Sequence, residues 1–460
     1  MSVEKLDVGV DGERMDRADR MDTAAVDPGP DAVTGDRAES GGQRLLRIVE
    51  ASSVRAMRRE AVDAETLRKA ALIVEEVRLG GEAALRRIAE RLGDLPVGGK
   101  LVWSRAELEA ELEELPGDQR ALLERTADRI RRFARAQRDS LRTLEVEIPG
   151  GRIGHRVEPM ERAGCYAPGG RFPLPSSVLM TVIPARIAGV QEVRVASPKP
   201  TRITLAAAAV AGADELLAVG GAQAIAALAL GAGVIPPADI VVGPGNSWVT
   251  AAKRLVMGEV AIDMLAGPSE LVILADAQAD PAWIAADLLA QAEHDPEALP
   301  VLIALDSGLI GRVEEALRVQ LEDLPTAPIA EAALRNGFAV VAQEIEEAIE
   351  LCDRLAPEHL ELLIRDPGAV ASSLRHYGAL FVGAGAAEVL GDYGIGPNHV
   401  LPTGGTSRSA GGLSALSFLR VRTFLELDDP RAAAAVVDDA AALARLEGLE
   451  GHARSALRRR

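Results

Sequence analysis

The sequence predicts an α/β protein with two cores and mainly parallel sheets. Short apolar segments of strand length alternate with helical segments between residues 193 and 246, and a second alternating series runs from residue 262 to 382. Such alternation is typical of strand-helix-strand units with a parallel sheet. At 460 residues and 48% hydrophobic content, the chain is long enough for two or three globular domains. Two α/β cores in one chain suggest a cleft between them.

The composition argues against several classes of protein. A formal net charge of -18 disfavours a nucleic-acid partner held by a basic surface. No apolar stretch reaches the roughly 18 residues that a membrane-spanning helix needs, and no apolar segment follows a basic N-terminal start. We therefore expect a cytoplasmic protein without a membrane partner. Its two cysteines, Cys165 and Cys352, are too few for a disulfide framework and suit a reducing compartment.

The N-terminal part is predicted to hold a tail and several helices. Residues 1–43 mix Asp, Gly, Arg and Pro with few aliphatic side chains, so we expect a disordered extension and assign it no function. From Leu45 the pattern becomes helical, and a long amphipathic stretch follows over 63–94. Residues 105–144 predict two further helices on either side of the Pro116-Gly117 break.

The first α/β series begins after the strand-like segment Val146–Arg156. A Gly/Pro-rich loop ends in Ser176-Ser177 before a helix over Val178–Ala188. Free N–H groups at such a helix start favour an anion, although an ordinary capped loop fits the same spacing and is the simpler interpretation. Three strands then lead into turns where open α/β sheets bind ligands: Val193–Val195, Leu216–Val219 and Ile240–Val242. No G-x-G-x-x-G motif opens a helix here, so the dinucleotide fingerprint is missing.

The second series predicts strands at Leu271–Ala275, Val301–Leu305, Ala339–Ala342, Leu360–Ile364 and Leu380–Val382, with helices over 309–320 and 344–354. Its opening helix, Pro281–His294, brings Gln291 and His294 onto one face, because residues three apart are neighbours on a helix. This spacing suits two ligands of one metal ion. Taken alone, it fits a cap of the helix C-terminus better.

Three later segments carry polar residues. In Pro357-Glu358-His359-Leu360 a helix gives way to a strand, and the pair is either an acid/base pair or a helix terminator with a satisfied histidine. The loop 391–406 is rich in glycine and polar groups, and its apolar anchors favour function over disorder. A predicted helix over 431–459 carries Glu447 and His452, and an isolated histidine near a chain end is usually solvated.

Nine ordered motifs show that the chain resembles the histidinol dehydrogenase family from roughly residue 45 to 455. They are GCYAPGG, LPSSVLMTVIPARIAG, VGGAQAIAALALG, VGPGNSWVTAAKR, IDMLAGPSE, LLAQAEHDP, LAPEHLEL, GDYGIGPNHVLPTGGTSRSAGGLS and EGLEGHARS. The resemblance implies an NAD-dependent oxidation of L-histidinol to L-histidine through L-histidinal. Two NAD+ are used, in the last two steps of histidine biosynthesis.

The resemblance also implies one Zn2+ per subunit. Its ligands fall on Gln291, His294, Asp392 and His452, a mixed set of amide, imidazole and carboxylate groups that suits zinc and leaves room for substrate. Catalysis is assigned to Glu358 and His359: the histidine takes the alcohol proton, and the glutamate activates water for attack on the aldehyde.

Further contacts follow from the same resemblance. Tyr166, Gln223 and Asn246 are expected to contact NAD+ in an incomplete Rossmann-like domain, which accounts for the missing fingerprint. Substrate contacts are expected from Ser269, Gln291, His294, Glu358, His359, Asp392, His399, Glu447 and His452.

The expected fold is α/β, with two incomplete Rossmann-like three-layer domains and small helical terminal segments that extend onto a dimer partner. A helical segment over 44–62 precedes a first domain, formed by 63–160 and 267–415, which holds the metal and catalytic residues. The resemblance implies that the second domain, 161–266, binds NAD+. The C-terminal segment, 416–460, is expected to swap between the subunits of a homodimer, so that His452 reaches the partner's metal.

Three alternatives remain at this point. A relative that oxidises another small alcohol, such as a sulfonated diol, would keep the catalytic pair. A thiol-acyl mechanism would need Cys165 or Cys352 as nucleophile, but neither has an evident base beside it. A purely structural zinc protein usually has four Cys or His ligands, which does not match the amide and carboxylate here.

Overall fold

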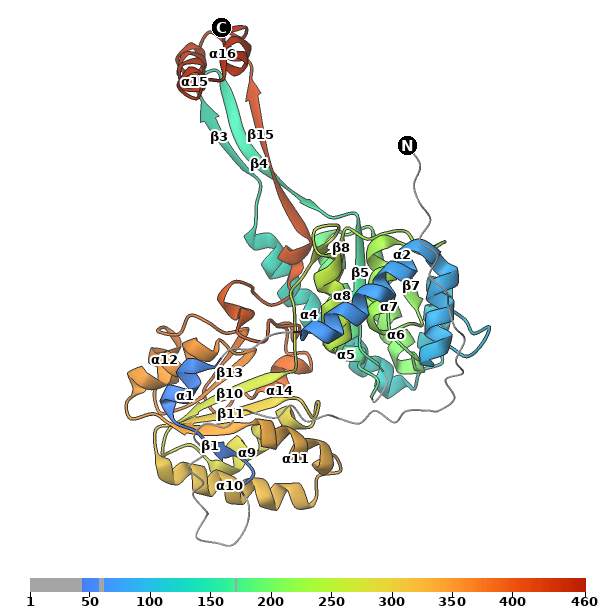
Figure 1. Ribbon diagram of the computed structural model, residues 1–460, viewed down its shortest axis with the longest axis vertical. Coiled ribbons are helices and arrows are strands. Elements are labelled where there is room, and N and C mark those ends of the chain that lie inside the picture. Colours follow the sequence, from blue (N-terminus) through green and yellow to red (C-terminus); the bar gives the residue numbers. More distant parts are fainter. Residues whose placement is uncertain (1–43, 58–61, 170–171) are drawn as a thin grey trace, which may run out of the picture. The chain divides into compact units, whose positions relative to one another are not determined.

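The computed structural model describes residues 44–57, 62–169 and 172–460. Residues Leu45–Arg460 form one unit that contains two six-stranded sheets and one three-stranded sheet (Figure 1). The predicted α/β class with mainly parallel sheets is therefore confirmed. The expected disordered extension, 1–43, lies outside the described residues. Among the helices that the structure describes, none is long and apolar enough to cross a membrane.

The first α/β domain is built on a wholly parallel sheet. Its strands, in spatial order, are β1 (Arg47–Ile48), β12 (Phe338–Val341), β11 (Leu299–Ala304), β10 (Glu270–Ala275), β13 (His359–Leu363) and β14 (Ala379–Val382). All six residues of β10 are buried, as expected when helices cover both faces of a parallel sheet. One face packs against α9 (Pro281–Ala292), α10 (Ser307–Glu322) and α11 (Ala327–Asn336), and the other against α1 (Ala51–Ala56), α12 (Ile345–Leu355) and α13 (Pro367–Ala371).

The second α/β domain has a similar three-layer arrangement. Its strand order is β2 (Val102–Ser104), β7 (Glu215–Leu217), β6 (Glu192–Ala196), β5 (Arg162–Tyr166), β8 (Ile240–Val242) and β9 (Ala261–Ile262), with only β2 antiparallel to its neighbour. Helices α3 (Arg105–Glu113), α4 (Gly117–Ser140), α5 (Pro175–Ala188) and α6 (Arg202–Ala211) cover one face. The other face is covered by α2 (Ala64–Leu92), α7 (Gly221–Leu230) and α8 (Ser247–Val256).

A three-stranded antiparallel sheet joins the second domain to the C-terminal helices. Its order is β15 (Leu419–Leu427), β4 (Gly151–Pro159) and β3 (Leu144–Ile148), and β4 pairs with β15 over nine residues (Figure 1). At the β3–β4 turn, the carbonyl oxygen of Gly150 accepts hydrogen bonds from the N–H groups of Asp428 and Asp429. Helices α15 (Ala434–Leu446) and α16 (Glu450–Leu457) follow and pack on each other.

The structure corrects the expected domain boundaries. Helices α2, α3 and α4 pack on the second sheet, and β2 pairs with β7, so residues 64–140 belong to the second domain rather than the first. The expected helix at Leu45–Val49 is instead strand β1, which extends the first sheet. Hydrogen bonding to strand β12 stabilises the extended conformation of this segment, although its local sequence pattern favours a helix.

Three further segments differ from prediction. The strand expected at Val146–Arg156 is a hairpin, because Gly150, at φ +82°, turns the chain between β3 and β4. The single helix expected over 431–459 is two helices, separated at Gly448, whose φ is +77°. Strand β15 was not predicted, since most of its side chains are partly or fully exposed and it lacks an apolar alternation.

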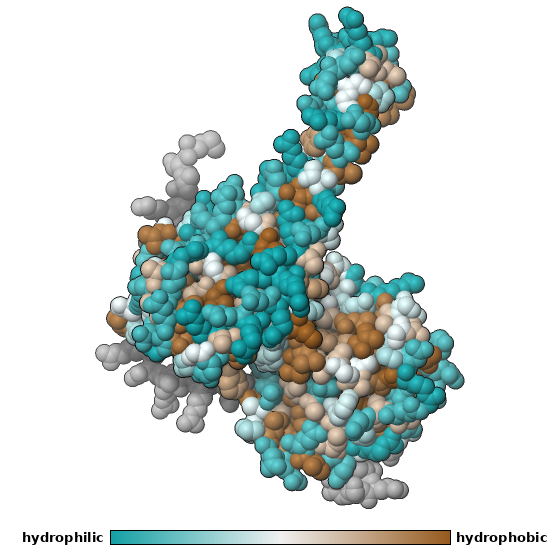
Figure 2. Space-filling view, turned by 180° about the vertical axis from the view of Figure 1, so that it is seen from behind, coloured by the Kyte–Doolittle hydropathy of each residue, from teal (hydrophilic) through white to brown (hydrophobic). Residues whose placement is uncertain are grey.

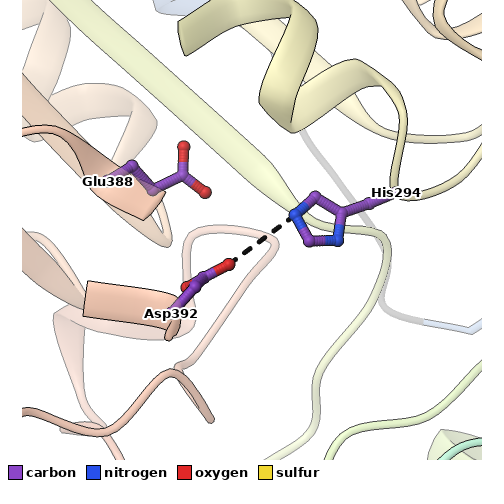
Figure 3. A group of neighbouring side chains, drawn as sticks. All are labelled: His294, Glu388 and Asp392. Atoms are coloured by element: carbon purple, nitrogen blue, oxygen red, sulfur yellow. Dashed lines mark ion pairs between the residues drawn. The ribbon is translucent and has the colours of Figure 1, made fainter. Parts of the chain in front are cut away.

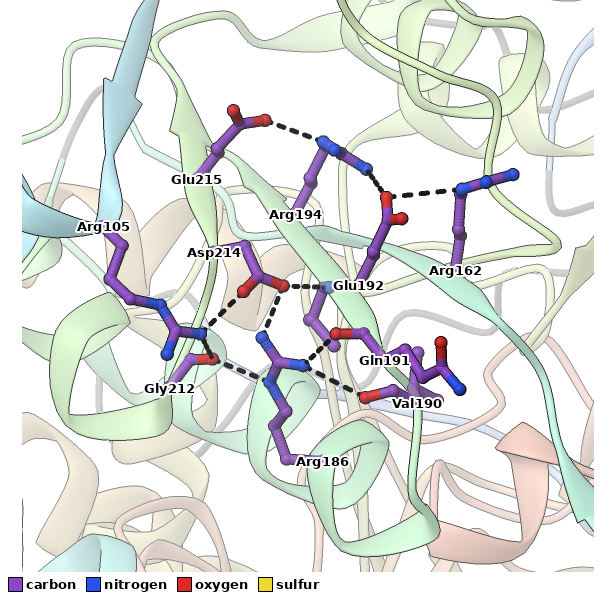
Figure 4. Close-up of polar contacts among 11 residues, drawn as sticks. Arg105, Arg162, Arg186, Val190, Gln191, Glu192, Arg194, Gly212, Asp214 and Glu215 are labelled. Atoms are coloured by element: carbon purple, nitrogen blue, oxygen red, sulfur yellow. Dashed lines mark hydrogen bonds and ion pairs between the residues drawn. The ribbon is translucent and has the colours of Figure 1, made fainter.

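A partly buried guanidinium connects several segments of the second domain where α5 ends. Arg186 donates hydrogen bonds to the carbonyl oxygens of Gly212 at 2.7 Å, Val190 at 3.0 Å and Gln191 at 2.6 Å, and it pairs with the carboxylate of Asp214 (Figure 4). The same carboxylate accepts a hydrogen bond from the Val193 N–H group and one from Arg105. These contacts fix α5, β6 and the end of α6 relative to one another.

Replacing Arg186 by Ala is expected to lower the free energy of unfolding by about 2–3 kcal/mol, because several carbonyl groups and Asp214 lose a charged donor. Urea unfolding followed by circular dichroism would measure the loss. The matched control is Arg105→Ala, which removes a more exposed partner of the same Asp214 and should have a much smaller effect. Equal losses in the two variants would contradict the expectation.

Candidate functional site

A cavity of about 360 Å³ is lined by residues of both α/β domains. The second domain contributes Tyr166, at the end of β5, and the segment 244–247, which follows β8. The first domain contributes segment 267–269, before β10, and the pair Glu358 and His359, at the start of β13. One sheet thus presents the carboxyl ends of its strands and the other presents the amino ends.

The Gln291 and His294 side chains enter this cavity from the end of α9. Asp280 caps the N-terminus of α9 and Pro281 occupies its first turn, both common at helix starts. The helix was predicted to reach His294 but ends at Ala292, four residues before Pro296, and proline restricts the residue that precedes it. Gln291 is buried in the last turn, whereas His294 lies just beyond it and is about one-third exposed.

Asp392 faces His294 across the cavity, with Nε2 of the histidine 3.6 Å from Oδ2 of the aspartate (Figure 3). Asp392 lies on the short helix α14 (Glu388–Asp392), where a loop was expected, and Glu388 approaches from the same helix. Ligand atoms of His294, Glu388 and Asp392 all lie within 4.8 Å of one another.

Several polar atoms of this cluster are buried without a hydrogen-bond partner. Both polar atoms of the Gln291 amide and Oδ1 of Asp392 are among them. Unpaired buried polar atoms are costly, and a bound cation would satisfy the oxygens. Amide oxygen, imidazole nitrogen and carboxylate oxygen are donors that a Zn2+ or similar ion accepts. The residues present therefore fit a metal ion.

Glu358 and His359 lie buried beside this cluster. The Glu358 carboxylate accepts a hydrogen bond from the Glu270 N–H group at 2.9 Å. Nδ1 of His359 lies 3.1 Å from the Glu270 carbonyl oxygen and 3.4 Å from the Glu388 carboxylate. Because a carbonyl can only accept, Nδ1 carries a proton, and Nε2 is the nitrogen that faces Asp392, at 3.6 Å.

Burial and charge shift the pKa values of these groups in opposite ways. Burial raises the pKa of Glu358 to about 8 and that of Glu388 to about 8. Burial alone would lower the pKa of His359, but the carboxylates of Glu388, Glu358 and Asp392 raise it to about 10. Asp392 is also buried, yet its histidine neighbours lower the pKa of its carboxyl. The cluster is therefore a site where a positive charge is stabilised.

The residues expected to contact NAD+ occupy the second-domain side. Tyr166 and Asn246 line the cavity, whereas Gln223 is buried behind it, and its amide donates to Asp94 at 2.8 Å. The Tyr166 hydroxyl accepts a hydrogen bond from the Gly221 N–H group at 3.2 Å. Burial raises the pKa of Tyr166 to about 12. The Asn246 side chain caps α8.

Ser269 and His399 also line the cavity. Nδ1 of His399 lies 2.9 Å from the Asp392 carbonyl oxygen, and Nε2 lies 3.4 Å from the Ser177 hydroxyl. The Asn398 amide donates to the Met180 carbonyl oxygen at 2.6 Å. The loop that follows α14 is thereby attached to α5 of the second domain, and burial lowers the pKa of His399.

Glu447 and His452 are not brought to this cavity within the chain. Both line a separate cavity between α15 and α16, beyond the β3–β4 turn. Since β4 has nine residues and each adds roughly 3.3 Å, these helices lie roughly 30 Å along the sheet from the second domain.

The two cysteines lie away from the cavity lining. Cys165, on β5, and Cys352, on α12, are fully buried in apolar cores of the two different α/β domains, and burial raises the pKa of the Cys165 thiol to about 12. Neither side chain is placed to act as a thiolate nucleophile, so the thiol-acyl alternative is not supported.

Three acidic residues were not predicted from the sequence: Glu388 lines the cavity, whereas Glu361 and Asp287 lie outside its lining. Glu388 lies four positions before Asp392, Asp287 lies four before Gln291 and Glu361 lies two after His359. Each spacing returns to the same face of a helix or strand, so periodicity counted from the candidate residues could have found all three. Burial, Asp287 and Glu388 raise the pKa of Glu361 to about 9.

The Glu361 carboxyl predicts a dependence of stability on pH. Its pKa in the folded chain is above that in the unfolded chain, so between pH 4.5 and about 9 the folded state binds more protons, and stability falls as pH rises. Glu361→Gln should remove up to about 1.4 kcal/mol per pH unit from this slope and be more stable than wild type near pH 9. Thermal unfolding between pH 6 and 9 measures both. The exposed Glu315→Gln control should keep the wild-type slope, and an unchanged slope in Glu361→Gln would contradict the expectation.

Comparison with known proteins shows extensive similarity to one family. Residues 56–460 match the family model for histidinol dehydrogenase. The histidinol dehydrogenase of Thermus thermophilus is 49% identical over 385 residues, which cover 83% of this chain and 92% of the relative. That of Cereibacter sphaeroides is 46% identical over 387 residues, covering 83% and 88%. A crystal structure of histidinol dehydrogenase from Elizabethkingia anophelis superposes with a TM-score of 0.84 at 29% identity, covering 91% of this chain and 98% of that one.

Proposed function

The chain belongs to the histidinol dehydrogenase family of NAD-dependent oxidoreductases, and from this premise we propose that it oxidises L-histidinol through L-histidinal to L-histidine. The reaction uses two NAD+ and one Zn2+ per subunit and completes histidine biosynthesis. The observation that carries the proposal is one cavity that holds Glu358 and His359 beside the Gln291, His294 and Asp392 donors. Unpaired buried cysteines suit a cytoplasmic enzyme.

Gln291, His294 and Asp392 would hold the zinc, together with His452 from a second subunit. The unpartnered buried atoms of Gln291 and Asp392 support this assignment. When bound, zinc would orient the amine and imidazole of the substrate, and NAD+ would accept the hydride. A cation at Asp392 would also offset the carboxylates that raise the pKa of His359, and so favour its neutral, basic form.

His359 is the general base of each oxidation. Its Nδ1–H is held by the Glu270 carbonyl oxygen and by Glu388, which leaves Nε2 as the acceptor of the alcohol proton. Loss of that proton forms the carbonyl bond as the hydrogen on carbon leaves with its electron pair. Glu388 touches the base rather than the substrate, so it acts as a positioning residue.

Glu358 activates the water that converts the aldehyde to its hydrate. Its carboxylate is oriented by the Glu270 N–H group. Burial raises the pKa of Glu358 to about 8, which makes the ionised form of this side chain a stronger base toward water than an ordinary carboxylate. The hydrate formed in this way carries a hydroxyl proton for the base. Its remaining C–H hydrogen can leave as the second hydride in the next oxidation. Burial of Glu358 and His359 keeps bulk water away from the reactive aldehyde.

The active enzyme is a homodimer with shared sites. Ser269 and His399 contact the substrate from the chain that supplies Gln291, His294 and Asp392, while Glu447 and His452 come from the partner subunit. The three-stranded sheet carries exposed hydrophobic side chains that a partner could cover: Leu144, Val146, Ile153, Val421 and Leu425. Figure 2 shows hydrophobic residues along this sheet between hydrophilic ones.

A steady-state assay of L-histidinol with NAD+, combined with metal analysis, tests this function. We expect turnover to L-histidine, one zinc per chain, and loss of activity on chelation while the dimer survives. Turnover of a different small alcohol, such as a sulfonated diol, without L-histidinol oxidation would favour the paralogue alternative. Dissociation into unfolded chains on chelation would favour a structural zinc.

A further inference from the structure

Two oppositely charged side chains are buried in the second domain, outside the catalytic cluster. Lys253 lies on α8 and Asp263 follows β9, and their side chains are 2% and 0% exposed. They form a direct ion pair. Burying two charges has a large desolvation cost, and well-packed apolar residues often serve stability as well. A role other than stability therefore has to account for the pair.

Both members of the pair bind the backbone of Gly243, the residue directly after β8. Nζ of Lys253 donates to the Gly243 carbonyl oxygen at 3.0 Å, and the Gly243 N–H group donates to Oδ2 of Asp263 at 2.7 Å. Gly243 has a φ of +120°, and a Cβ added to it would lie 2.0 Å from the Tyr166 carbonyl oxygen. The Gly243 peptide groups are thus held between the end of β5 and the ion pair.

The pair connects two segments of the cavity wall. Pro244, Gly245 and Asn246 follow the clamped glycine and line the cavity. On the other side, Oδ1 of Asp263 accepts the Met264 N–H group at 2.7 Å, just before the lining segment 266–269. Thr250, on the same helix as Lys253, donates to the Ala266 carbonyl oxygen. One buried pair therefore sets the spacing of both segments.

We propose that Lys253 and Asp263 are positioning residues for nicotinamide-cofactor binding. They act by holding the 243–246 turn, and with it Asn246, against segment 266–269. This inference rests on the proposed function, in which NAD+ lies against this wall. Neither side chain lines the cavity. Loosening the turn therefore weakens cofactor binding more than it slows hydride transfer.

The test compares Lys253→Met, Asp263→Asn and the double variant Lys253→Met/Asp263→Asn. We expect KM for NAD+ to rise about 10-fold or more, with kcat within about 3-fold of wild type and zinc content unchanged. The double variant removes both buried charges, so it should fold even where a single variant leaves one charge unpaired. Titration of NADH by its fluorescence gives the same comparison without turnover.

Two control variants separate positioning from general destabilisation. Arg78→Met breaks an exposed ion pair with Glu259, in the connection between α8 and β9, and Arg186→Ala destabilises the same domain away from the cavity. Both should keep the wild-type KM for NAD+. An unchanged KM in the double variant, a rise in KM for L-histidinol instead, or failure of the double variant to fold would each overturn the proposal. A wild-type chain that binds NADH without oxidising L-histidinol would contradict only the proposed substrate. Titration of NADH would still test whether Lys253 and Asp263 position the cofactor-binding turn.

Discussion

Replacing His359 by Asn is expected to lower kcat by about 10²- to 10⁴-fold, because the substrate alcohol loses its proton acceptor. The asparagine amide can still donate to the Glu270 carbonyl oxygen, which the Nδ1–H of His359 does now, so the fold around β13 should persist. Zinc content should be unchanged, since none of the proposed ligands is altered. Steady-state kinetics and metal analysis on the same preparation check both expectations.

The matched control for this substitution is His376→Asn. His376 lies outside the cavity lining, and its described contact is a backbone N–H bond to Asp353, so kcat should remain near the wild-type value. A His359→Asn enzyme with nearly full kcat would rule out His359 as the base. A loss of zinc that parallels the loss of rate would instead assign His359 to the metal site.

Mixing two inactive variants is expected to restore activity. His359→Asn and His452→Ala each disable the sites of their own homodimers. In a hybrid dimer, the subunit that retains His359 would receive an intact His452 from its partner, so one site of two is complete. With random exchange of subunits, about one quarter of the wild-type activity should return. Activity would be measured after joint refolding and compared with each variant refolded alone.

The outcome distinguishes shared sites from sites within one chain. If His452 served the cavity of its own chain, every hybrid would contain two damaged sites and no activity would return. The control is a mixture of His359→Asn with Glu358→Gln. Each of these residues lines the cavity of its own chain, so the mixture should remain inactive whether or not the sites are shared.

Much of the fold was predictable because buried parallel strands have a strong sequence pattern. The strands at β8, β10 and β13 were placed to within one residue, since each is a short, fully buried segment of mostly apolar residues. The break at Pro116-Gly117 between α3 and α4 was likewise predicted from backbone chemistry alone. Local signals sufficed wherever one segment determines its own structure.

The assignment of segments to domains was not predictable in the same way. Helix α2 is amphipathic whichever sheet it covers, so only its packing on α7 and α8 shows that it belongs to the second domain. Strand β15 is stabilised by pairing with β4, more than 250 residues earlier in the chain. Such long-range partners leave no local pattern in the sequence.

The site residues likewise divide into those with a local sequence signal and those brought together only by long-range contacts. Gln291 and His294 could be paired by spacing, but Asp392 and Glu388 reach them only through the tertiary fold. Resemblance to a family supplied Asp392, whereas Glu388 and Glu361 have no counterpart in the motif roles and emerged from burial beside His359. The sequence alone left the Gln291–His294 pair as a plausible helix cap.

The length of the three-stranded sheet is itself a constraint on a shared site. Strands β4 and β15 run in register over nine residue pairs, from the second domain to the turn at Gly150. Deleting two residues from each strand would keep every side chain on its own face but shorten the sheet by roughly 7 Å. Deleting one would exchange the faces altogether. The number of residue pairs in this sheet therefore determines how far His452 lies from the α/β domains of its own chain.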